Sequence, residues 1–313
     1  MFEKKREKIG ENDIIRVKAS PAYSISDTFE CGQCFRAEKT KDEGGYVEYV
    51  TVVGDTLLRV GQNERGEVIL YGLTDEEFEK IVLPYLSLDT DYEKIKEEIK
   101  SLTASEWLKE ACDAGAGIAI LRQDAWETLF SFIISQNNNI PRIKKIIRKI
   151  CSLYGVNICL QKGVKKCPFG KTDATPCDEI CRDCGACYTF PTPEDILKSP
   201  ELLLLSNPGF RYKYLLDAAK KVYSGEVNLE KIKSEGSYEY TMENLKRILG
   251  VGDKVASCCA LFGFENYEAF PIDVWMKRAI DTYFEGSLDY ISLGKYAGIA
   301  QQYIFHYIRN IEN

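Results

Sequence analysis

The feature that most restricts the fold of this chain is a pair of glycines, Gly250 and Gly252, between two amphipathic segments. Before them, apolar residues recur at helical spacing from 242 to 249, and Thr241 is available as an N-cap. After them, Asp253 is placed to cap a second helix. Because glycine adopts backbone conformations closed to other residues, the chain can reverse tightly here. The pattern predicts two helices joined by a Gly-x-Gly hairpin.

A hairpin of this kind turns its backbone N–H groups outward, where they bind phosphate without a charged side chain. We therefore expect Gly250 and Gly252 to contact a DNA backbone. A Gly-x-Gly turn between helices also occurs as an ordinary helix C-cap, and the glycines alone leave both interpretations open.

Two reactive side chains lie close to this hairpin in the sequence. Lys254 falls in the first turn of the second helix, where the helix dipole disfavours an ammonium, and partial burial would disfavour it further. Both effects favour the neutral amine that a nucleophile requires. Asp273 follows Pro271, which suits position N1 of the next helix, so the same dipole keeps this carboxylate ionised. We expect amine and carboxylate to converge, although a solvated lysine and a capping aspartate are the simpler alternative.

The segment 249–256, followed by Pro271, Asp273 and Val274, resembles the helix-hairpin-helix Gly/Pro/Asp superfamily of DNA glycosylases. Within it, the best match is the 8-oxoguanine DNA glycosylase family. The resemblance implies that Lys254 is the catalytic nucleophile and that Asp273 stabilises positive charge on the sugar. It covers most of the chain.

The predicted fold class is α+β. Residues 1–115 form the first expected domain, because short β-branched and aromatic runs at 46–53, 56–60 and 68–71 alternate with turn-prone glycines and predict an antiparallel sheet. Helical patterns follow at 75–86 and 92–102. Residues 116–313 form the second expected domain, an all-α helix-hairpin-helix glycosylase domain with a cysteine-rich insert at 159–187.

The resemblance also implies a pocket for the damaged base. The segment 31–36 is expected to begin a strand with a glycine, and the family's matching motif makes the Gly32 carbonyl the acceptor for the N7 hydrogen of 8-oxoguanine. A bulge glycine is the alternative. Gln301 and Phe305 lie four residues apart on a helix expected at 292–311. In the family, this glutamine reads the Watson–Crick edge, and the phenylalanine sandwiches the base against a cysteine, here Cys258.

Further residues match the family's contacts to DNA. Asn137 and Arg142 correspond to the asparagine and arginine that surround the orphaned partner base. Phe210 stands where the family usually has a tyrosine wedge, and Arg211 would contact the opposite cytosine. A core phenylalanine is the alternative for Phe210. Trp275 departs from the histidine of better-known members, which puts its contact with the flipped nucleotide's phosphate in doubt.

The net charge of −7 argues against a polycation that coats DNA nonspecifically, but it leaves room for a local basic face. Five basic residues crowd one predicted helix: Arg142, Lys144, Lys145, Arg148 and Lys149. A solvated helix face explains them equally well.

No apolar run reaches the roughly 18 residues of a membrane span, and residues 1–11 are charged rather than apolar. We expect neither a membrane span nor a secretory signal, and place the protein in the cytoplasm, on DNA. The chain has 12 cysteines, which fits a reducing compartment where thiols serve as ligands, core residues or reactive groups.

The cysteines of the insert have the spacing of a metal site. Cys177, Cys181, Cys184 and Cys187 are separated by three, two and two residues, and Cys167 is a candidate in place of one of them. Such gaps suit a structural zinc or an iron–sulfur cluster, with free thiols as the alternative. The 8-oxoguanine family does not generally carry this insert. No cofactor is expected for catalysis.

These features predict a bifunctional, monomeric repair enzyme that binds double-stranded DNA containing oxidised guanine. It would excise 8-oxoguanine through a Schiff base on Lys254 and nick the strand by β-elimination. There are three alternatives. The first is a non-catalytic helix-hairpin-helix DNA-binding module, the second is a glycosylase for another damaged base, and the third is a glycosylase with an iron–sulfur cluster.

Overall fold

The computed structural model describes residues 3–9, 12–164, 168 and 185–311. Its N-terminal part is a six-stranded antiparallel sheet in the order β1-β2-β6-β5-β4-β3. The strands are β1 (Glu3–Ile9), β2 (Asn12–Lys18), β3 (Glu38–Glu43), β4 (Tyr46–Val53), β5 (Thr56–Gln62) and β6 (Glu67–Tyr71). The three predicted strands are β4, β5 and β6, with slightly longer bounds for the last two. The mixed α+β class is confirmed.

The segment at 31–36 does not begin a strand, contrary to the prediction. It follows α1 (Ile25–Glu30) as an irregular connection that leads into β3. Gln33 fixes this connection, because its buried amide donates to the carbonyls of Thr28 and Ala119 and accepts from the Leu121 N–H, all at 2.8 Å. Every polar atom of that amide is therefore used to hold the backbone beside Gly32.

Helices follow the sheet. The predicted helix at 75–86 is α2 (Asp75–Glu77), a π-helical turn η1 (Phe78–Val82) and α3 (Leu83–Tyr85), and the one at 92–102 is α4 (Tyr92–Leu102). The next elements are α5 (Glu106–Ala114), α6 (Ala125–Ser135), α7 (Ile140–Tyr154) and α8 (Ile158–Gln161). After the segment outside the described residues come α10 (Pro193–Lys198), the 3₁₀ turns η2 (Pro200–Ser206) and η3 (Gly209–Arg211), α11 (Tyr212–Tyr223) and α12 (Leu229–Glu235).

The chain ends with α13 (Tyr238–Leu245), α14 (Asp253–Phe264), α15 (Val274–Tyr283), the 3₁₀ turn η4 (Ile291–Tyr296) and α16 (Ala297–Ile311). The last predicted helix, 292–311, is therefore shorter at its start, because the backbone kinks at Gly294, where φ is +52°. Helix α14 forms the centre of the helical part, and all its residues from Val255 to Phe264 are buried. It packs on α6, where Phe132 and Phe262 stack with ring centroids 5.6 Å apart.

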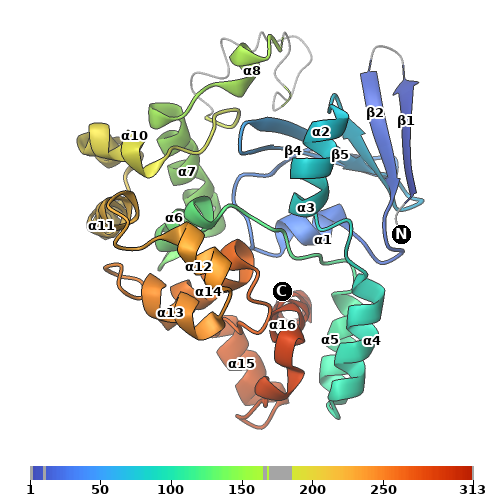
Figure 1. The fold of residues 1–313 in the computed structure, drawn as a ribbon. Helices are drawn as coiled ribbons and strands as arrows, with labels where there is room; N and C mark the ends of the chain where they lie inside the picture. Colours follow the sequence, from blue (N-terminus) through green and yellow to red (C-terminus); the bar gives the residue numbers. More distant parts are fainter. Residues whose placement is uncertain (1–2, 10–11, 165–167, 169–184, 312–313) are drawn as a thin grey trace.

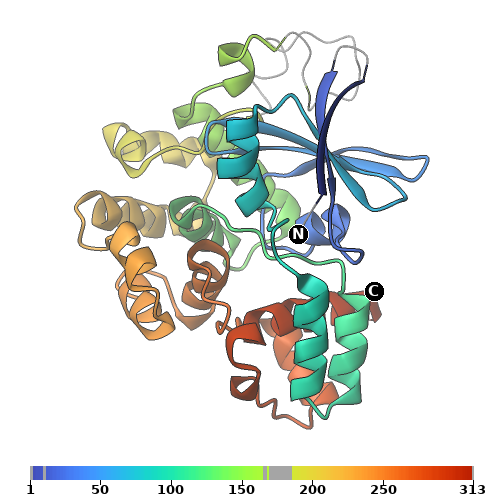
Figure 2. The same ribbon diagram turned by 45° about the vertical axis from the view of Figure 1, so that its right-hand side comes forward.

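Helices α4 and α5 lie beside the C-terminal helices α15 and α16, away from the sheet (Figures 1 and 2). The rings of Trp107 on α5 and Tyr283 on α15 stack at 4.4 Å between centroids. These two helices precede the expected domain boundary at residue 115 but pack against elements that follow it. The boundary remains a prediction.

Candidate active site

The predicted helix-hairpin-helix is formed by α13 and α14. Its caps differ from the expectation: Ser237, not Thr241, caps α13, and Gly252, not Asp253, is the N-cap of α14. Gly250 has φ of +80°, and a Cβ there would lie 2.5 Å from the Tyr214 ring, so both conformation and space require glycine.

Gly252 is extended, and a Cβ there would meet nothing within 4 Å. No side chain in the described part of the chain caps the first turn of α14. The nearby Asp253 carboxylate is instead paired with Lys246 at 2.8 Å. The first N–H groups of α14, which have no partner inside the helix, are thus left for an external acceptor.

Six predicted site residues line a single cavity of about 50 Å³. They are Lys254, Asp273, Gly32, Cys258, Gln301 and Phe305. They come from the connection after α1, from α14, from the start of α15 and from α16. The structure thus brings together side chains that are up to 273 residues apart in the sequence, from Gly32 to Phe305.

Lys254 lies in the first turn of α14 and is exposed, so the expected partial burial is wrong. Its Nζ is 5.4 Å from the centroid of the Phe132 ring. Cys258 follows one turn later on the same helix. Burial raises the pKa of the Cys258 thiol to about 11, and the neighbouring Lys254 charge only partly opposes this. Cys258 therefore stays a neutral, weakly polar wall of the cavity near neutral pH.

Asp273 is the N-cap of α15, which corrects the expectation that Pro271 occupies N1. Its carboxylate accepts from the Met276 N–H at 2.9 Å, which anchors the side chain at the positive end of α15. Trp275, in the first turn of this helix, is half-buried, and the Arg278 guanidinium lies 5.6 Å from its ring centroid.

Gly32 and Phe305 lie close to each other in the wall of the cavity. Gly32 has φ of +87°, and a Cβ built on it would lie 3.8 Å from Phe305 Cε1. The positive φ alone therefore favours glycine here. Gln301 is buried, and its Oε1 accepts a hydrogen bond from Gln302 Nε2 at 2.7 Å. Gln302 also lines the cavity, which its place beside Gln301 in the sequence did not indicate.

The residues expected to contact DNA outside the cavity lie on neighbouring loops. Phe210 is 50% exposed and makes an edge contact with Tyr214, as a wedge would need. Asn137 and Arg142 are exposed. Arg211, by contrast, is buried: its Nε donates to the Gln136 carbonyl at 2.9 Å and its guanidinium to the Asn137 carbonyl at 3.0 Å. In this structure Arg211 braces the loop of Asn137, and its contact with an opposite base stays a prediction.

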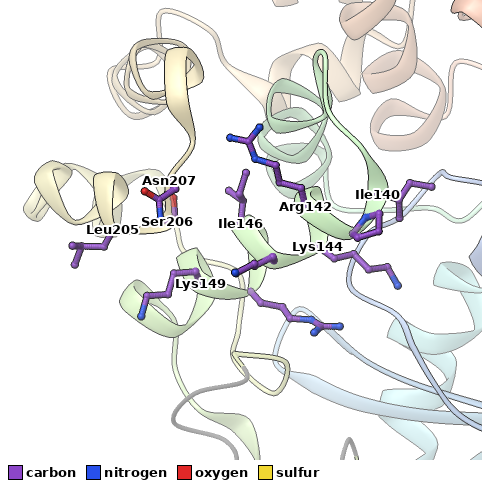
Figure 3. Close-up of a pocket in the computed structure, with 11 residues that line it drawn as sticks. Ile140, Arg142, Lys144, Ile146, Lys149, Leu205, Ser206 and Asn207 are labelled. Carbon is purple, nitrogen blue, oxygen red and sulfur yellow. The ribbon is translucent and has the colours of Figure 1, made fainter.

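A basic groove of about 970 Å³ runs beside this loop, between α7 and the end of η2. Figure 3 shows α7 on one side, with Leu205, Ser206 and Asn207 on the other. Two of its basic residues, Lys144 and Arg148, form ion pairs with Glu38. The other three, Arg142, Lys145 and Lys149, are exposed and have no ion pair with any residue that the structure describes.

The proposed metal ligands Cys167, Cys177, Cys181 and Cys184 lie outside the described residues. Cys187 is described and buried, and its carbonyl accepts from the Ile158 N–H at 2.9 Å. The described ranges contain no group of three or more His, Cys, Asp or Glu that could hold a metal ion. The metal site therefore remains a prediction. Nor does any described helix have the length and apolar character needed to cross a membrane.

The chain is similar to several known proteins. A profile of the 8-oxoguanine DNA glycosylase N-terminal domain matches residues 14–129. The N-glycosylase/DNA lyase of Saccharomyces cerevisiae is 30% identical over 281 residues, which cover 81% of this chain and 66% of the yeast protein. The structure of MBOgg1 in complex with a low-affinity DNA ligand has a TM-score of 0.79 and 36% identity, and the match covers 99% of this chain and 100% of that one. The Clostridium acetobutylicum 8-oxoguanine glycosylase/lyase, bound to duplex DNA with cytosine opposite 8-oxoG, has a TM-score of 0.79 and 32% identity, with 99% of each chain covered.

Proposed function

Because this chain belongs to the 8-oxoguanine DNA glycosylase family, we propose that it excises 8-oxoguanine from duplex DNA and then cuts the strand at the same site. The observation that carries the proposal is the meeting of Lys254 and Asp273 in one cavity with Gly32, Cys258, Gln301 and Phe305. An amine, a carboxylate, an amide and an aromatic ring are the groups that this reaction needs.

An enzyme that acts on a base within a duplex must first rotate that base out of the stack. Phe210, half-exposed at its turn, would fill the gap that the base leaves. Asn137 and Arg142 would hold the partner base. Arg211 holds the loop that carries Asn137, because its guanidinium group donates hydrogen bonds to the carbonyls of Gln136 and Asn137.

The basic groove would bind the phosphates of the duplex beyond the lesion. Arg142, Lys145 and Lys149 lack ion-pair partners among the described residues, so their charge is available to DNA. On the other side of the site, the hairpin of Gly250 and Gly252 would bind phosphate through the uncapped N–H groups of α14.

In the chemical step, the neutral amine of Lys254 attacks C1′ of the extruded nucleotide, and the bond from C1′ to N9 breaks as the base leaves. The sugar ring then opens, which gives a Schiff base between C1′ and Nζ. Loss of a proton from C2′ expels the 3′ phosphate by β-elimination, and water releases Lys254. Asp273, held by its N-cap bond to α15, would stabilise the positive charge that develops on the sugar.

Recognition of the base would use the rest of the cavity. The Gly32 carbonyl accepts the N7 hydrogen that 8-oxoguanine has and guanine lacks, and Gln301 bonds the Watson–Crick edge. The neutral Cys258 thiol and the Phe305 ring cover the two faces of the base. Phe305 is only half-buried, so it is the side chain of this cavity best placed to adjust when the base enters.

Borohydride trapping tests the proposal directly. The protein is incubated with duplexes that carry 8-oxoguanine opposite each of the four bases, and sodium borohydride reduces any Schiff base to a stable protein–DNA adduct. We expect an adduct with the wild-type protein and none with Lys254→Gln. A DNA-binding module without catalysis gives no adduct with any duplex, and a glycosylase for another lesion gives one only with that lesion.

We also propose the coarser organisation expected from the sequence: domains at 1–115 and 116–313, and an intracellular monomer that uses side chains alone for catalysis. For the insert at 159–187, we propose a structural metal held by Cys177, Cys181, Cys184 and Cys187, with Cys167 as a substitute. Metal analysis of the purified protein tests this, and absorbance at about 400 nm distinguishes an iron–sulfur cluster from zinc.

A further inference from the structure

Two consecutive glutamines, Gln301 and Gln302, line the base cavity, although neighbouring residues of a helix point about 100° apart. The two residues are 3% and 4% exposed. Glutamine is found mostly on protein surfaces, and buried amides need hydrogen-bond partners. Two of them side by side in the wall of one cavity therefore call for a ligand with matching polar groups.

A single hydrogen bond couples the two amides. Gln302 Nε2 donates to Gln301 Oε1 at 2.7 Å, which leaves the Gln302 carbonyl oxygen buried and without a donor among the described residues. The NH₂ group of Gln301 has no acceptor within the described chain either. The pair thus has one donor group, on Gln301, and one buried acceptor without a described donor, on Gln302, and the hydrogen bond between the two amides sets their relative orientation.

This arrangement matches the edge of a purine that carries a 6-oxo and a 2-amino group. Such an edge has one acceptor, O6, followed by two donors, N1–H and the 2-amino group. The Gln301 donor suits O6, and the Gln302 oxygen suits an N–H. A 6-aminopurine has a donor where O6 stands, so both amides would have to turn together to fit it.

Building on the proposed function, we infer that Gln302 determines specificity: its carbonyl oxygen accepts a hydrogen bond from the 2-amino group of the extruded base, while its NH₂ group fixes the orientation of Gln301. A cavity wall built in this way rejects a base that lacks the 2-amino group, because the buried oxygen then stays unpaired.

Single-turnover excision from two duplexes tests the inference. One contains 8-oxoguanine and the other 8-oxohypoxanthine, which differs only in the missing 2-amino group. We expect the wild-type protein to excise 8-oxoguanine roughly 30-fold faster, and the Gln302→Leu variant to reduce this ratio to less than about threefold. The reduction should come from slower excision of 8-oxoguanine. Gln302→Met, a second apolar replacement with an unbranched side chain, should give the same result.

Tyr303→Phe is the matched control. Tyr303 is the next residue on α16 and is fully buried, and its hydroxyl has no partner among the described residues, but it does not line the cavity. Its variant should keep the wild-type ratio. Cleavage of a duplex with a preformed abasic site, which has no base to read, is measured for every variant. Each excision rate is divided by it, so that a loss of folding or of Lys254 reactivity does not alter the ratio between the two bases.

The outcomes separate this inference from the proposed function. If the wild-type protein excises neither base, the proposed function itself is wrong. Equal excision of both bases by the wild-type protein, or an undiminished ratio in both Gln302 variants, would overturn only the role of Gln302.

Discussion

At the scale of single residues, Asp273 combines two tasks that one substitution can separate. Its carboxylate caps α15 through the Met276 N–H, and it lines the cavity beside Lys254. Asparagine caps a helix about as well as aspartate, but it carries no charge. Asp273→Asn therefore removes the electrostatic contribution and keeps the local structure.

We expect Asp273→Asn to slow base excision by about 100- to 1,000-fold while the melting temperature stays within experimental error, because only charge stabilisation is lost. Lys254→Gln should reduce both excision and strand cleavage by at least about 1,000-fold, since the nucleophile is gone. Single-turnover assays with a gel readout measure both steps. Normal strand cleavage by Lys254→Gln would refute the assignment of the nucleophile.

Some residues of the site could be predicted from the sequence, and others could not. Gly32, Cys258, Gln301 and Phe305 could be placed because they match a known motif, and the structure puts them at one cavity. Gln302 was missed because helical periodicity assigns neighbouring residues to different faces. The burial of Arg211 was also unforeseen, since its acceptors at Gln136 and Asn137 are distant in the sequence.

Among the helices and strands, α7 carries basic residues of two kinds: some form ion pairs with the sheet, and others lie in the groove. Lys144 and Arg148 pair with Glu38 of β3 and so join the helix to the sheet. Lys145 and Lys149 point to the groove and have no ion pair among the described residues. The sequence predicted the cluster but could not divide it, because Glu38 lies about 100 residues earlier in the chain.

Reversing the two groove charges, in Lys145→Glu with Lys149→Glu, should weaken binding of duplex DNA. The slope of log K against log salt is negative, and each lost phosphate contact reduces its magnitude by about 0.9. We therefore expect the magnitude of the slope to fall by roughly 1.8. Fluorescence anisotropy at several salt concentrations measures this slope. Lys18→Glu with Lys41→Glu, on the sheet, changes the net charge equally and should leave the slope nearly unchanged. An equal decrease in both variants would show that net charge, not the groove, is responsible.

The composition of the sequence predicted three inner strands of the sheet but not its edge strands. The runs of β4, β5 and β6 are rich in valine, leucine and aromatic residues, and they were found from composition. The two edge strands, β1 and β3, are dominated by lysine and glutamate. Charged residues are tolerated at a sheet edge, and these strands exist because a neighbour pairs with them.

At the scale of the whole molecule, a buried ion pair connects the sheet to the helices. Arg36, at the end of the connection that contains Gly32, is 7% exposed and pairs with Glu127 of α6 at 3.0 Å. Its guanidinium also donates to the Tyr188 carbonyl. Three segments far apart in the sequence therefore meet at one side chain.

Arg36→Met should lower the free energy of unfolding by roughly 3 kcal/mol, because the Glu127 carboxylate is left without its partner in a largely buried position. Adding Glu127→Gln removes the stranded charge and should restore a substantial part of the loss. Urea denaturation of the two single variants and the double variant measures the coupling. Additive losses would mean that the two side chains do not act as a pair.

The single histidine gives the stability of the molecule a predictable pH dependence. Burial lowers the pKa of His306 below its usual value of 6.5, with Arg309 acting in the same direction and Asp27 against it. The folded state thus prefers the neutral imidazole. Its contribution to stability is fully present above pH 6.5 and is lost as the pH falls through the lower folded-state pKa.

We therefore expect His306→Asn to reduce the loss of stability between about pH 7.5 and about pH 5.5. Urea denaturation at both pH values tests this, and the lone imidazole can be titrated directly by NMR. A measured pKa above 6.5 in the folded protein would reverse the expected sign.

The separation of the base cavity from the basic groove has a consequence for inhibitors. Free purines in solution can use only the groups that line the cavity, whereas a nucleotide within DNA is also held by the charges of the groove. Small heterocycles should consequently be poor competitors of this protein, and duplexes that extend over the groove should be good ones.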